Sequence, residues 1–330
     1  MANLRVSVGI PVYNEELIVP ELLRRVNAVL DTVPGGPHEI VLVDDGSRDR
    51  TLEMLTAAAA ENPRLVVVAL SRNFGHQAAL TAAMDHVTGD AVVVMDGDLQ
   101  DAPEAIPTFL QYHAQGYDVV YAKRVMRKEV WYLRLAYFVF YRLILRLSEI
   151  KLPVDSGDFG LMSRRVVDTL RRAPEHNRYL RGLRTWVGFR QIGVDVERSE
   201  RFAGDSKYSA LKLLRLAADG IFSFSIVPLR AAAAAGFVAI LGASLFTIYA
   251  IYVRAVLHQS PPGFTAIIVL VTFLAGINLL FMGVIGEYVG RVYEEVKSRP
   301  AYIVGSVTRR PATAASPSPS SPADRTRTPG

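Results

Sequence analysis

Two long stretches near the C-terminus contain no charged residue, and they limit what this 330-residue chain can fold into. They run from Ala231 to Val253 and from Gly263 to Gly286. Each exceeds the roughly 20 residues that a helix rising about 1.5 Å per residue needs to cross about 30 Å of hydrocarbon. A buried helical hairpin is the alternative, but two uncharged runs of this length favour two membrane-spanning helices.

Basic residues flank the two runs. Arg230 precedes the first, and Arg291, Lys297 and Arg299 follow the second, whereas Arg254 lies in the short connection. Because cytoplasmic flanks are enriched in Lys and Arg, we expect both flanks on the cytoplasmic side. The N-terminus has no secretory-signal pattern, so we expect the first part of the chain in the cytoplasm too. The sequence therefore predicts a multi-pass protein of the inner (plasma) membrane.

The first part of the chain alternates between short apolar runs and helical patterns. The strand candidates are Val6–Val12, Glu39–Val43, Leu65–Leu70, Ala91–Met95 and Asp118–Tyr121. The helix candidates between them are Glu16–Leu30, Asp49–Ala60, His76–Val87 and Pro103–Ala114. Apolar strands separated by helices predict an α/β domain with a mainly parallel sheet covered on both faces. Ligands of such sheets bind beyond the carboxyl ends of the strands, although no G-x-G-x-x-G or Walker loop is present.

Two further segments combine apolar and basic residues. In Trp131–Ile150, Arg134, Arg142 and Arg146 share one helical face, and Ala210–Phe224 has a similar composition. We expect amphipathic helices in the lipid headgroup region, with a buried core helix as the alternative for the first. The net charge of +5 suits nucleic acid or a lipid surface, and we expect a membrane and no nucleic acid. The absence of cysteine excludes thiolate metal sites and Cys nucleophiles.

Acidic residues follow two of the predicted strands. Asp96 and Asp98, with Gln100 close by, end an apolar strand, where two carboxylates can hold a hard divalent cation together with phosphate oxygens of a ligand. A surface turn is the alternative. Asp44 and Asp45 end another strand, where a carboxylate can accept hydrogen bonds from a base or ribose. Ser47 or Asp49 can instead cap the next helix, and both can hold, with Asp45 on the ligand.

The acidic loops belong to a series of runs that resembles family-2 glycosyltransferases. The runs are IPVYNEE (10–16), VLVDDGSRDRT (41–51), SRNFGHQAAL (71–80) and VVVMDGDLQDAPEAIP (92–107). DSGDFGLMSRR (155–165), YLRGLRTWVGF (179–189) and RFAGDSKYS (201–209) resemble the dolichol-phosphate mannose synthase and bacterial polyprenyl-phosphate glycosyltransferase branch. The resemblance covers about residues 5–230, and the paired apolar runs extend it to about 290. Gly97 and Ala102 stand where relatives often have Ala and Pro, which we expect to leave the metal site intact.

The resemblance implies a GT-A type domain and a set of site residues. Catalytic roles fall on Asp158, or Asp155, and on Asp98, and the metal site for Mg²⁺ or Mn²⁺ on Asp96, Asp98 and Gln100. The implied substrate-binding residues are Pro11, Tyr13, Asn14, Glu15, Asp44, Asp45, Ser71, Arg72, Asn73, Gly75, Gln77, Asp96, Gly97, Arg124, Arg127, Arg201, Lys207 and Tyr208. Each basic residue alone can also be a solvated surface charge.

The resemblance also implies the reaction. A single sugar would pass, with inversion, from a nucleotide-sugar to polyprenyl phosphate, with UDP-hexose or UDP-N-acetylhexosamine favoured over GDP-mannose. We expect residues 1–229 to form the cytoplasmic GT-A domain with interfacial helices at about 130–150 and 210–226. Residues 230–290 would form the transmembrane region and 291–330 a largely disordered cytoplasmic tail, with disorder from about Ser306. A homo-oligomer, dimer or tetramer, stays open. The alternatives are a processive polysaccharide synthase, disfavoured by the missing Q-x-x-R-W motif, and a non-catalytic membrane scaffold subunit.

Overall fold

The structure is a computed structural model, and it describes residues 4–124, 156–173, 175, 178, 180–196, 227–256 and 263–310. The strands are β1 (Val6–Val12), β2 (Glu39–Asp44), β3 (Leu65–Leu70), β4 (Ala91–Val94), β5 (Val119–Arg124), β6 (Ser156–Ser163), β7 (Gln191–Val196) and β8 (Val304–Arg309). The helices are α1 (Val19–Thr32), α2 (Thr51–Glu61), α3 (His76–His86), η1 (Pro103–Ala105), α4 (Ile106–Ala114), α6 (Arg164–Arg171), α7 (Leu180–Trp186), α9 (Val227–Val256) and α10 (Phe264–Lys297).

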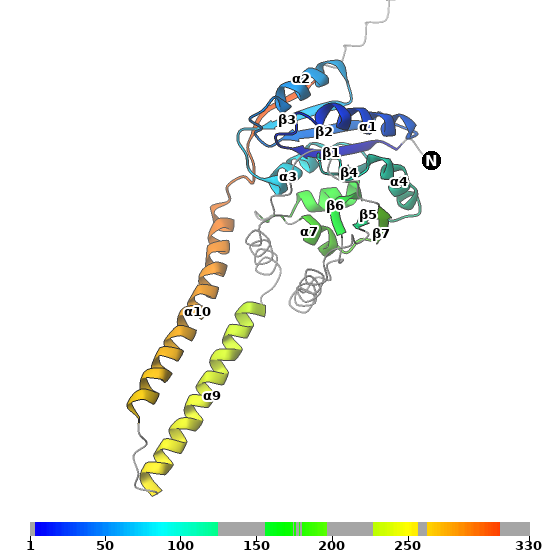
Figure 1. Ribbon diagram of the computed structural model, residues 1–330. Coiled ribbons are helices and arrows are strands. Elements are labelled where there is room, and N and C mark those ends of the chain that lie inside the picture. Colours follow the sequence, from blue (N-terminus) through cyan, green and yellow to red (C-terminus); the bar gives the residue numbers. More distant parts are fainter. Residues whose placement is uncertain are drawn as a thin grey trace, which may run out of the picture.

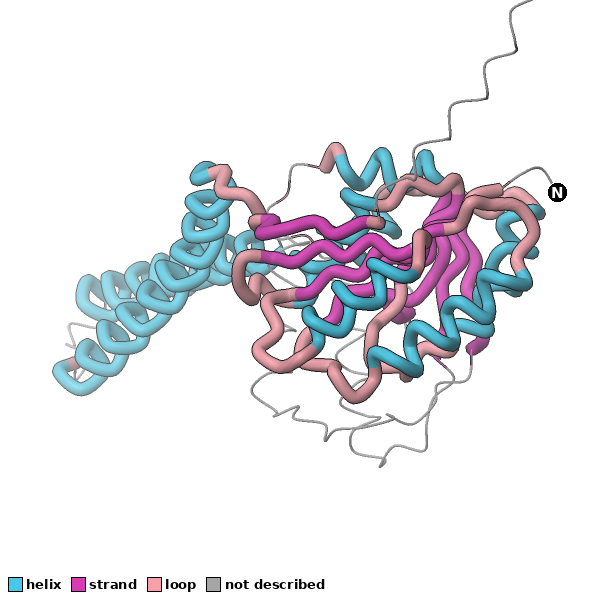
Figure 2. Tube along the Cα trace, turned by 90° about the horizontal axis from the view of Figure 1, so that it is seen from above, coloured by secondary structure: helices cyan, strands magenta, loops and turns pink. Residues whose placement is uncertain are grey.

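One sheet forms the centre of the molecule (Figure 2). Within the described part of the chain its strand order is β7-β5-β6-β4-β1-β2-β3-β8. The strands β4, β1, β2 and β3 are parallel to one another, and β5 is parallel to β7. β6 pairs antiparallel with β4 and β5, and β8 pairs antiparallel with β3. The mainly parallel α/β sheet expected from the sequence is therefore present.

The central strands are buried on both faces because helices cover both. Every residue of β1 and of β3 is buried, as expected for strands that are almost wholly apolar. On one face β1 packs against apolar side chains of α1, α2 and α4, including Leu22 and Phe109. On the other face α3 packs against β2 and β3, α6 against β4 and β6, and α7 against β6, with Leu80 and Val166 in the shared core. The two cores hold the carboxyl ends of the parallel strands at a common edge.

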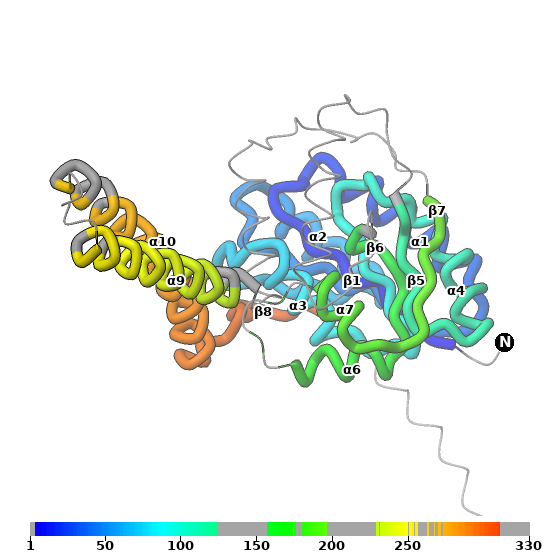
Figure 3. The backbone as a smooth tube through the Cα atoms, turned by 90° about the horizontal axis from the view of Figure 1, so that it is seen from below, coloured from blue at the N-terminus to red at the C-terminus, as the bar shows by residue number. Residues whose placement is uncertain are grey.

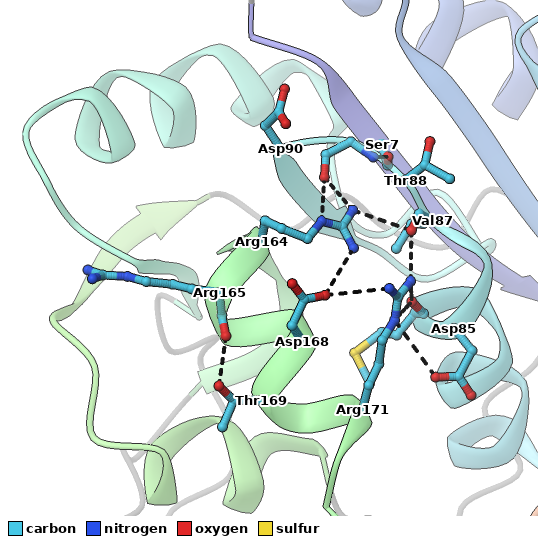
Figure 4. Close-up of polar contacts among 12 residues, drawn as sticks. Ser7, Asp85, Val87, Thr88, Asp90, Arg164, Arg165, Asp168, Thr169 and Arg171 are labelled. Atoms are coloured by element: carbon cyan, nitrogen blue, oxygen red, sulfur yellow. Dashed lines mark hydrogen bonds and ion pairs between the residues drawn. The ribbon is translucent and has the colours of Figure 1, made fainter.

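Two arginines attach α6 to the last turn of α3 and to the turn that follows it (Figure 4). Arg171 Nε donates to the carbonyl oxygen of Met84 at 2.9 Å, and Arg164 Nε donates to that of Gly89 at 2.8 Å. Asp168 lies between the two guanidinium groups, 3.6 Å from Arg164 and 3.5 Å from Arg171. Carbonyl groups in the last turn of a helix have no partner within the helix, so Arg171 satisfies such an acceptor on Met84, and Arg164 binds the turn that follows α3.

The two apolar helices extend away from the sheet side by side (Figures 1 and 3). By length and composition, Ala232–Val253 in α9 and Phe273–Lys297 in α10 are each able to cross a membrane. Their large apolar side chains, such as Phe237 and Leu279, are exposed. A buried helical hairpin would hide these side chains, so the described residues do not support that alternative. The helices are longer than the expected spans: α9 begins at Val227, before the first span, and α10 ends at Lys297, after the second.

The chain returns to the sheet after α10, which corrects one expectation (Figure 1). Disorder was expected from about Ser306, but Val304–Arg309 form β8 on the edge of β3. The backbone N–H of Ser71 donates to the carbonyl oxygen of Ile303 at 2.9 Å, and Tyr302 Oη donates to Asp85 Oδ2 at 2.8 Å. The open edge of β3 supplies hydrogen-bond partners that a polar segment lacks on its own. The expected interfacial helices and residues 311–330 lie outside the described residues.

Candidate active site

Polar loops meet at the carboxyl ends of the parallel strands. The register places Val12 of β1 beside Asp44 of β2, and Gly9 of β1 beside Val94 of β4. The loops that follow these strands therefore adjoin one another, as ligand-binding loops of open α/β sheets do. Sequence reasoning placed the site at this edge, and the structure brings together the loops that follow β1, β2, β3 and β4.

Short polar contacts fix the loops after β1 and β2 to each other. The Asn14 backbone N–H donates to Ser47 Oγ at 2.9 Å, and the Arg48 N–H donates to Asn14 Oδ1 at 2.8 Å. Asn14 has φ 53°, in the left-handed region that Asn tolerates better than most residues. The Glu15 N–H donates to Thr51 Oγ1 at 2.9 Å. Asn14 and Glu15 were predicted to bind substrate, and these contacts hold their backbone at the rim of the sheet.

The adjacent carboxylates Asp44 and Asp45 have different surroundings. Asp45 accepts hydrogen bonds from the backbone N–H groups of Phe74 at 2.7 Å and Gly75 at 3.0 Å, so it holds the loop after β3. Burial raises the pKa of the Asp45 carboxyl, and these two donors oppose the rise. Asp44 Oδ2 accepts from the Ser47 N–H at 3.2 Å, but its buried Oδ1 accepts no hydrogen bond within the described residues.

These contacts show what the acidic loop after β2 holds within the protein. Asp45 was expected on the ligand with Ser47 as a helix cap, but both Asp45 oxygens bind the loop after β3 and Ser47 accepts from the loop after β1. α2 has no side-chain cap on its N-cap residue, Arg50. Asp49 accepts from the Thr51 N–H at 3.0 Å instead. Of the two carboxylates Asp44 and Asp45, Asp44 has the buried oxygen that accepts no hydrogen bond from the described residues.

The Asp96–Asp98 turn follows β4 and carries a second buried carboxylate oxygen. Asp98 Oδ1 accepts from the Gln100 N–H at 3.1 Å, whereas the buried Asp96 Oδ1 accepts no hydrogen bond within the described residues. Burial raises the pKa of Asp96, and the carboxylates of Asp158 and Asp98 add to the rise. A Cβ at Gly97 would lie 2.9 Å from the Pro11 carbonyl oxygen, so β1 approaches this turn closely.

The geometry fits a divalent cation that is held partly by a ligand. Among the described residues no group of three or more His, Cys, Asp or Glu side chains surrounds a common point. Asp96 nevertheless presents a buried anionic oxygen without a hydrogen bond, and Asp98 follows it in the same turn. Hard cations such as Mg²⁺ commonly bind one or two carboxylates and complete their shell with phosphate oxygens and water. Gln100, the third predicted metal ligand, contacts the turn through its backbone N–H, which donates to Asp98.

Asp158 of β6 faces this turn and is held by two basic residues. Its side chain is 3% exposed, and Arg181 of α7 forms a two-pronged ion pair with it, Nε to Oδ1 at 2.8 Å and Nη2 to Oδ2 at 2.9 Å. His76 at the start of α3 has its Nε2 3.4 Å from Asp96 Oδ1 and 3.8 Å from Asp158 Oδ2. His76 therefore lies between the two acidic groups.

The pKa values in this cluster follow from its charges. Burial alone would raise the pKa of Asp158, but His76 and Arg181 outweigh it and lower that pKa well below the usual range. Asp158, and after it Asp96, raise the pKa of the His76 imidazole. Asp158 is thus an ionised carboxylate at neutral pH, although it is almost fully buried.

Other predicted residues line or support the same edge. Arg72 lies over the Phe74 ring at 4.0 Å, and Tyr13 is 40% exposed at the end of β1. Asn73 Nδ2 donates to the Asp45 carbonyl oxygen at 3.1 Å, and Gln77 Oε1 accepts from the Leu180 N–H at 3.2 Å. Five predicted residues lie outside the described part of the chain: Asp155, Arg127, Arg201, Lys207 and Tyr208. Of Arg124, in β5, only the backbone is described.

Two residues of the site were missed as functional residues. His76 and Arg181 lie in the runs SRNFGHQAAL and YLRGLRTWVGF, which carry the family resemblance. Alone, a histidine at a helix start and an arginine among several give no signal of a site. Their position in these runs was the available signal.

Comparison with known proteins shows the family. A model described as glycosyl transferase family 2 matches residues 7–171, which contain both acidic turns and Asp158. The protein belongs to glycosyl transferase family 2. The resemblance drawn from the sequence motifs is therefore confirmed, together with the GT-A type of fold that it implied.

Relatives of this glycosyl transferase match it over most of its length. An uncharacterized glycosyltransferase of Bacillus subtilis is 43% identical over 303 residues, 92% of this chain and 94% of its own. The bactoprenol glucosyl transferase of Shigella phage SfX is 39% identical over 304 residues, 92% of this chain and 99% of its own. A mannosyltransferase from Pyrobaculum calidifontis, solved with GDP-Man and Mn²⁺, is 21% identical, with a TM-score of 0.45 over 74% of this chain and 81% of its own. The first two matches extend well beyond the family-2 region.

Proposed function

We propose that this glycosyl transferase moves a single sugar from a nucleotide-sugar to the phosphate of a polyprenyl phosphate, with inversion and with a divalent metal. The product would be a polyprenyl-phosphate-sugar for modification of cell-envelope glycans. One observation carries the proposal: among the described residues, a buried carboxylate oxygen of Asp44 and one of Asp96 accept no hydrogen bond, and both residues follow parallel strands of a chain with two exposed apolar helices. The bactoprenol glucosyl transferase relative supports a polyprenyl acceptor.

The donor would lie across the carboxyl ends of β1, β2 and β4. Asp44 Oδ1 offers an acceptor to an N–H or hydroxyl of the nucleoside, since it has no described partner. Asp96 and Asp98 would hold Mg²⁺ or Mn²⁺ on the diphosphate, where a bound cation neutralises the charge of the leaving group. UDP-hexose or UDP-N-acetylhexosamine is favoured as donor, and GDP-mannose is the alternative.

Displacement at the anomeric carbon accounts for the role of Asp158. The bond from that carbon to the donor's diphosphate oxygen breaks, the nucleoside diphosphate leaves with the electron pair, and an acceptor phosphate oxygen forms the new bond. A phosphate monoester has a second pKa of about 6, so the acceptor is largely ionised at neutral pH and needs no strong base. Asp158, ionised and paired with Arg181, can stabilise positive charge on the sugar ring or orient the acceptor.

Membrane attachment fits an acceptor that stays in the bilayer. The exposed apolar surfaces of α9 and α10 would lie in lipid, and the basic flanks would place the sheet on the cytoplasmic side of the plasma membrane. Asp155, Arg124, Arg127, Arg201, Lys207 and Tyr208 stay proposed site residues. A homo-oligomer stays proposed as well.

The test uses the full-length protein with Mn²⁺, a polyprenyl phosphate and labelled UDP- and GDP-sugars. Transfer of label into the organic phase from one donor, lost in Asp96→Ala, would support the reaction and identify the sugar. Arg165→Gln, which removes an ion pair of the opposite sheet edge, is the control for folding. No transfer from any donor by a folded protein would refute the proposal and favour the scaffold alternative.

A further inference from the structure

Helix α7 is attached to the active site at three points along one side. Its first residue, Leu180, donates its backbone N–H to Gln77 of α3 at 3.2 Å. Arg184, one turn later and 2% exposed, donates to the carbonyl oxygen of Gly157 at 3.2 Å. Arg181 lies between them and reaches the side chain of Asp158. The short helix therefore contacts the backbone and the side chain of neighbouring residues of β6.

The Arg181 guanidinium fixes the plane of the Asp158 carboxylate. Two N–H groups in a rigid fork meet the two carboxylate oxygens at 2.8 and 2.9 Å. Such a pair sets both direction and rotation, which a single hydrogen bond or a lysine ammonium does not. Arg181 keeps 28% of its side chain exposed, whereas Asp158 keeps 3%. The exposed part of the pair belongs to the arginine, and the buried part to the carboxylate.

We propose that Arg181 is a positioning residue, which holds the Asp158 carboxylate in the orientation that sugar transfer requires. The proposal rests on the proposed function, because it gives Asp158 its part in the reaction. Orientation matters here because a misplacement of about 1 Å at a reacting centre costs about 10²-fold in rate. α7 supplies the rigidity, since Leu180 and Arg184 hold the helix on both sides of Arg181.

The charges around Asp158 support this assignment. The described groups that face it are His76 from α3, Asp96 after β4 and Arg181 from α7. Without Arg181, the buried carboxylate would lose its fork and keep only the more distant imidazole. A buried carboxylate without its partner favours the protonated form, so the pKa of Asp158 would rise. Both its orientation and its charge would change together.

The experiment compares Arg181→Gln with Arg165→Gln in the full-length protein. Arg165 forms the same two-pronged pair with Asp118, whose side chain is 7% exposed. Asp118 lies beside Ser163, at the end of β6 that is farther from Asp158. Arg165 is therefore a chemically matched control. Each variant is assayed for kcat and KM with the donor sugar that the wild type accepts, and for affinity for the nucleoside diphosphate with Mn²⁺ by calorimetry. Arg181→Lys, which keeps the charge without the fork, is measured beside them.

We expect Arg181→Gln to lower kcat by roughly 10²-fold with little change in donor KM or nucleotide affinity, and Arg181→Lys to recover part of the loss. Arg165→Gln should leave both constants unchanged. Equal kcat in the two Gln variants, or a rise in donor KM at constant kcat, would overturn the proposal. If Arg181→Gln does not fold, the kcat of Arg181→Lys decides in the same way. A wild type that transfers no sugar refutes the proposed function instead.

Discussion

Replacement by Asn should have opposite effects at the neighbouring residues Asp44 and Asp45: it should weaken nucleotide binding at Asp44 and lower the stability at Asp45. Asp45 holds the Phe74 and Gly75 N–H groups, whereas Asp44 leaves a buried oxygen without a described partner. Replacing either residue by Asn removes one negative charge and relieves the same repulsion between the two carboxylates. The difference between the variants therefore reports what each side chain contacts.

The expected magnitudes follow from these contacts. An amide in place of Asp45 turns an NH₂ toward one of the two N–H donors, which costs one hydrogen bond to a charged group, about 1.5–3 kcal/mol. For a domain of this size that lowers the Tm by about 3–12 °C. Asp44→Asn keeps an oxygen for the Ser47 N–H, so its Tm should stay close to that of the wild type. Loss of the acceptor for the nucleoside should weaken donor binding by about 10- to 100-fold.

Thermal unfolding of the detergent-solubilised chain gives the Tm, and calorimetry with UDP or GDP and Mn²⁺ gives the affinity. Asp44→Asn should be the more stable variant and the weaker binder. If both variants lower the Tm equally, the assignment of Asp45 to the loop is wrong. If Asp44→Asn binds the nucleotide as the wild type does, its unpaired oxygen does not face the donor.

Three further predictions concern stability. Gly160→Ala should prevent folding or lower the Tm strongly, because a Cβ there would lie 2.6 Å from the Val120 carbonyl oxygen; circular dichroism would show it. The pKa of Asp158 is lowered in the folded state, so its pairing with Arg181 stabilises the wild type at pH values above the ordinary Asp pKa of about 3.9. This stabilisation is lost as the pH falls toward the pKa of the folded state. The Tm difference between wild type and Arg181→Gln should therefore be constant from neutral pH down to about pH 5 and shrink below it. Tyr302→Phe should lower the stability by about 1–2 kcal/mol, measured by urea unfolding, since one hydrogen bond to a carboxylate is lost.

The parallel strands could be predicted because a strand that is buried on both faces consists mostly of consecutive apolar residues. β3 is apolar throughout and β1 is so except for Ser7, and their predicted bounds match the observed ones. β6 and β8 were not predicted as strands, since SGDFGLMS and VGSVTR contain glycine and polar residues without a regular alternation. Their strand form depends on the edges of β4, β5 and β3, which lie far away in the sequence, and local patterns do not report such pairing.

The site was predictable where it follows a strand. Asp44 and Asp96 end apolar strands, and both were predicted to contact the ligand or the metal. The distinction between Asp44 and Asp45 was not predictable, because it depends on two N–H groups of the loop after β3. Arg181 reaches Asp158 from a separate helix, so only the fold reveals the pair.

The position of β8 imposes an order on how the molecule is assembled. The chain leaves the sheet, makes both apolar helices, and returns to supply the last strand on the edge of β3. During synthesis, which starts from the N-terminus, that edge stays open until both helices have been translated. An open edge strand can pair wrongly with other chains. The sheet can thus gain its last strand only after all residues of α9 and α10 have been synthesised.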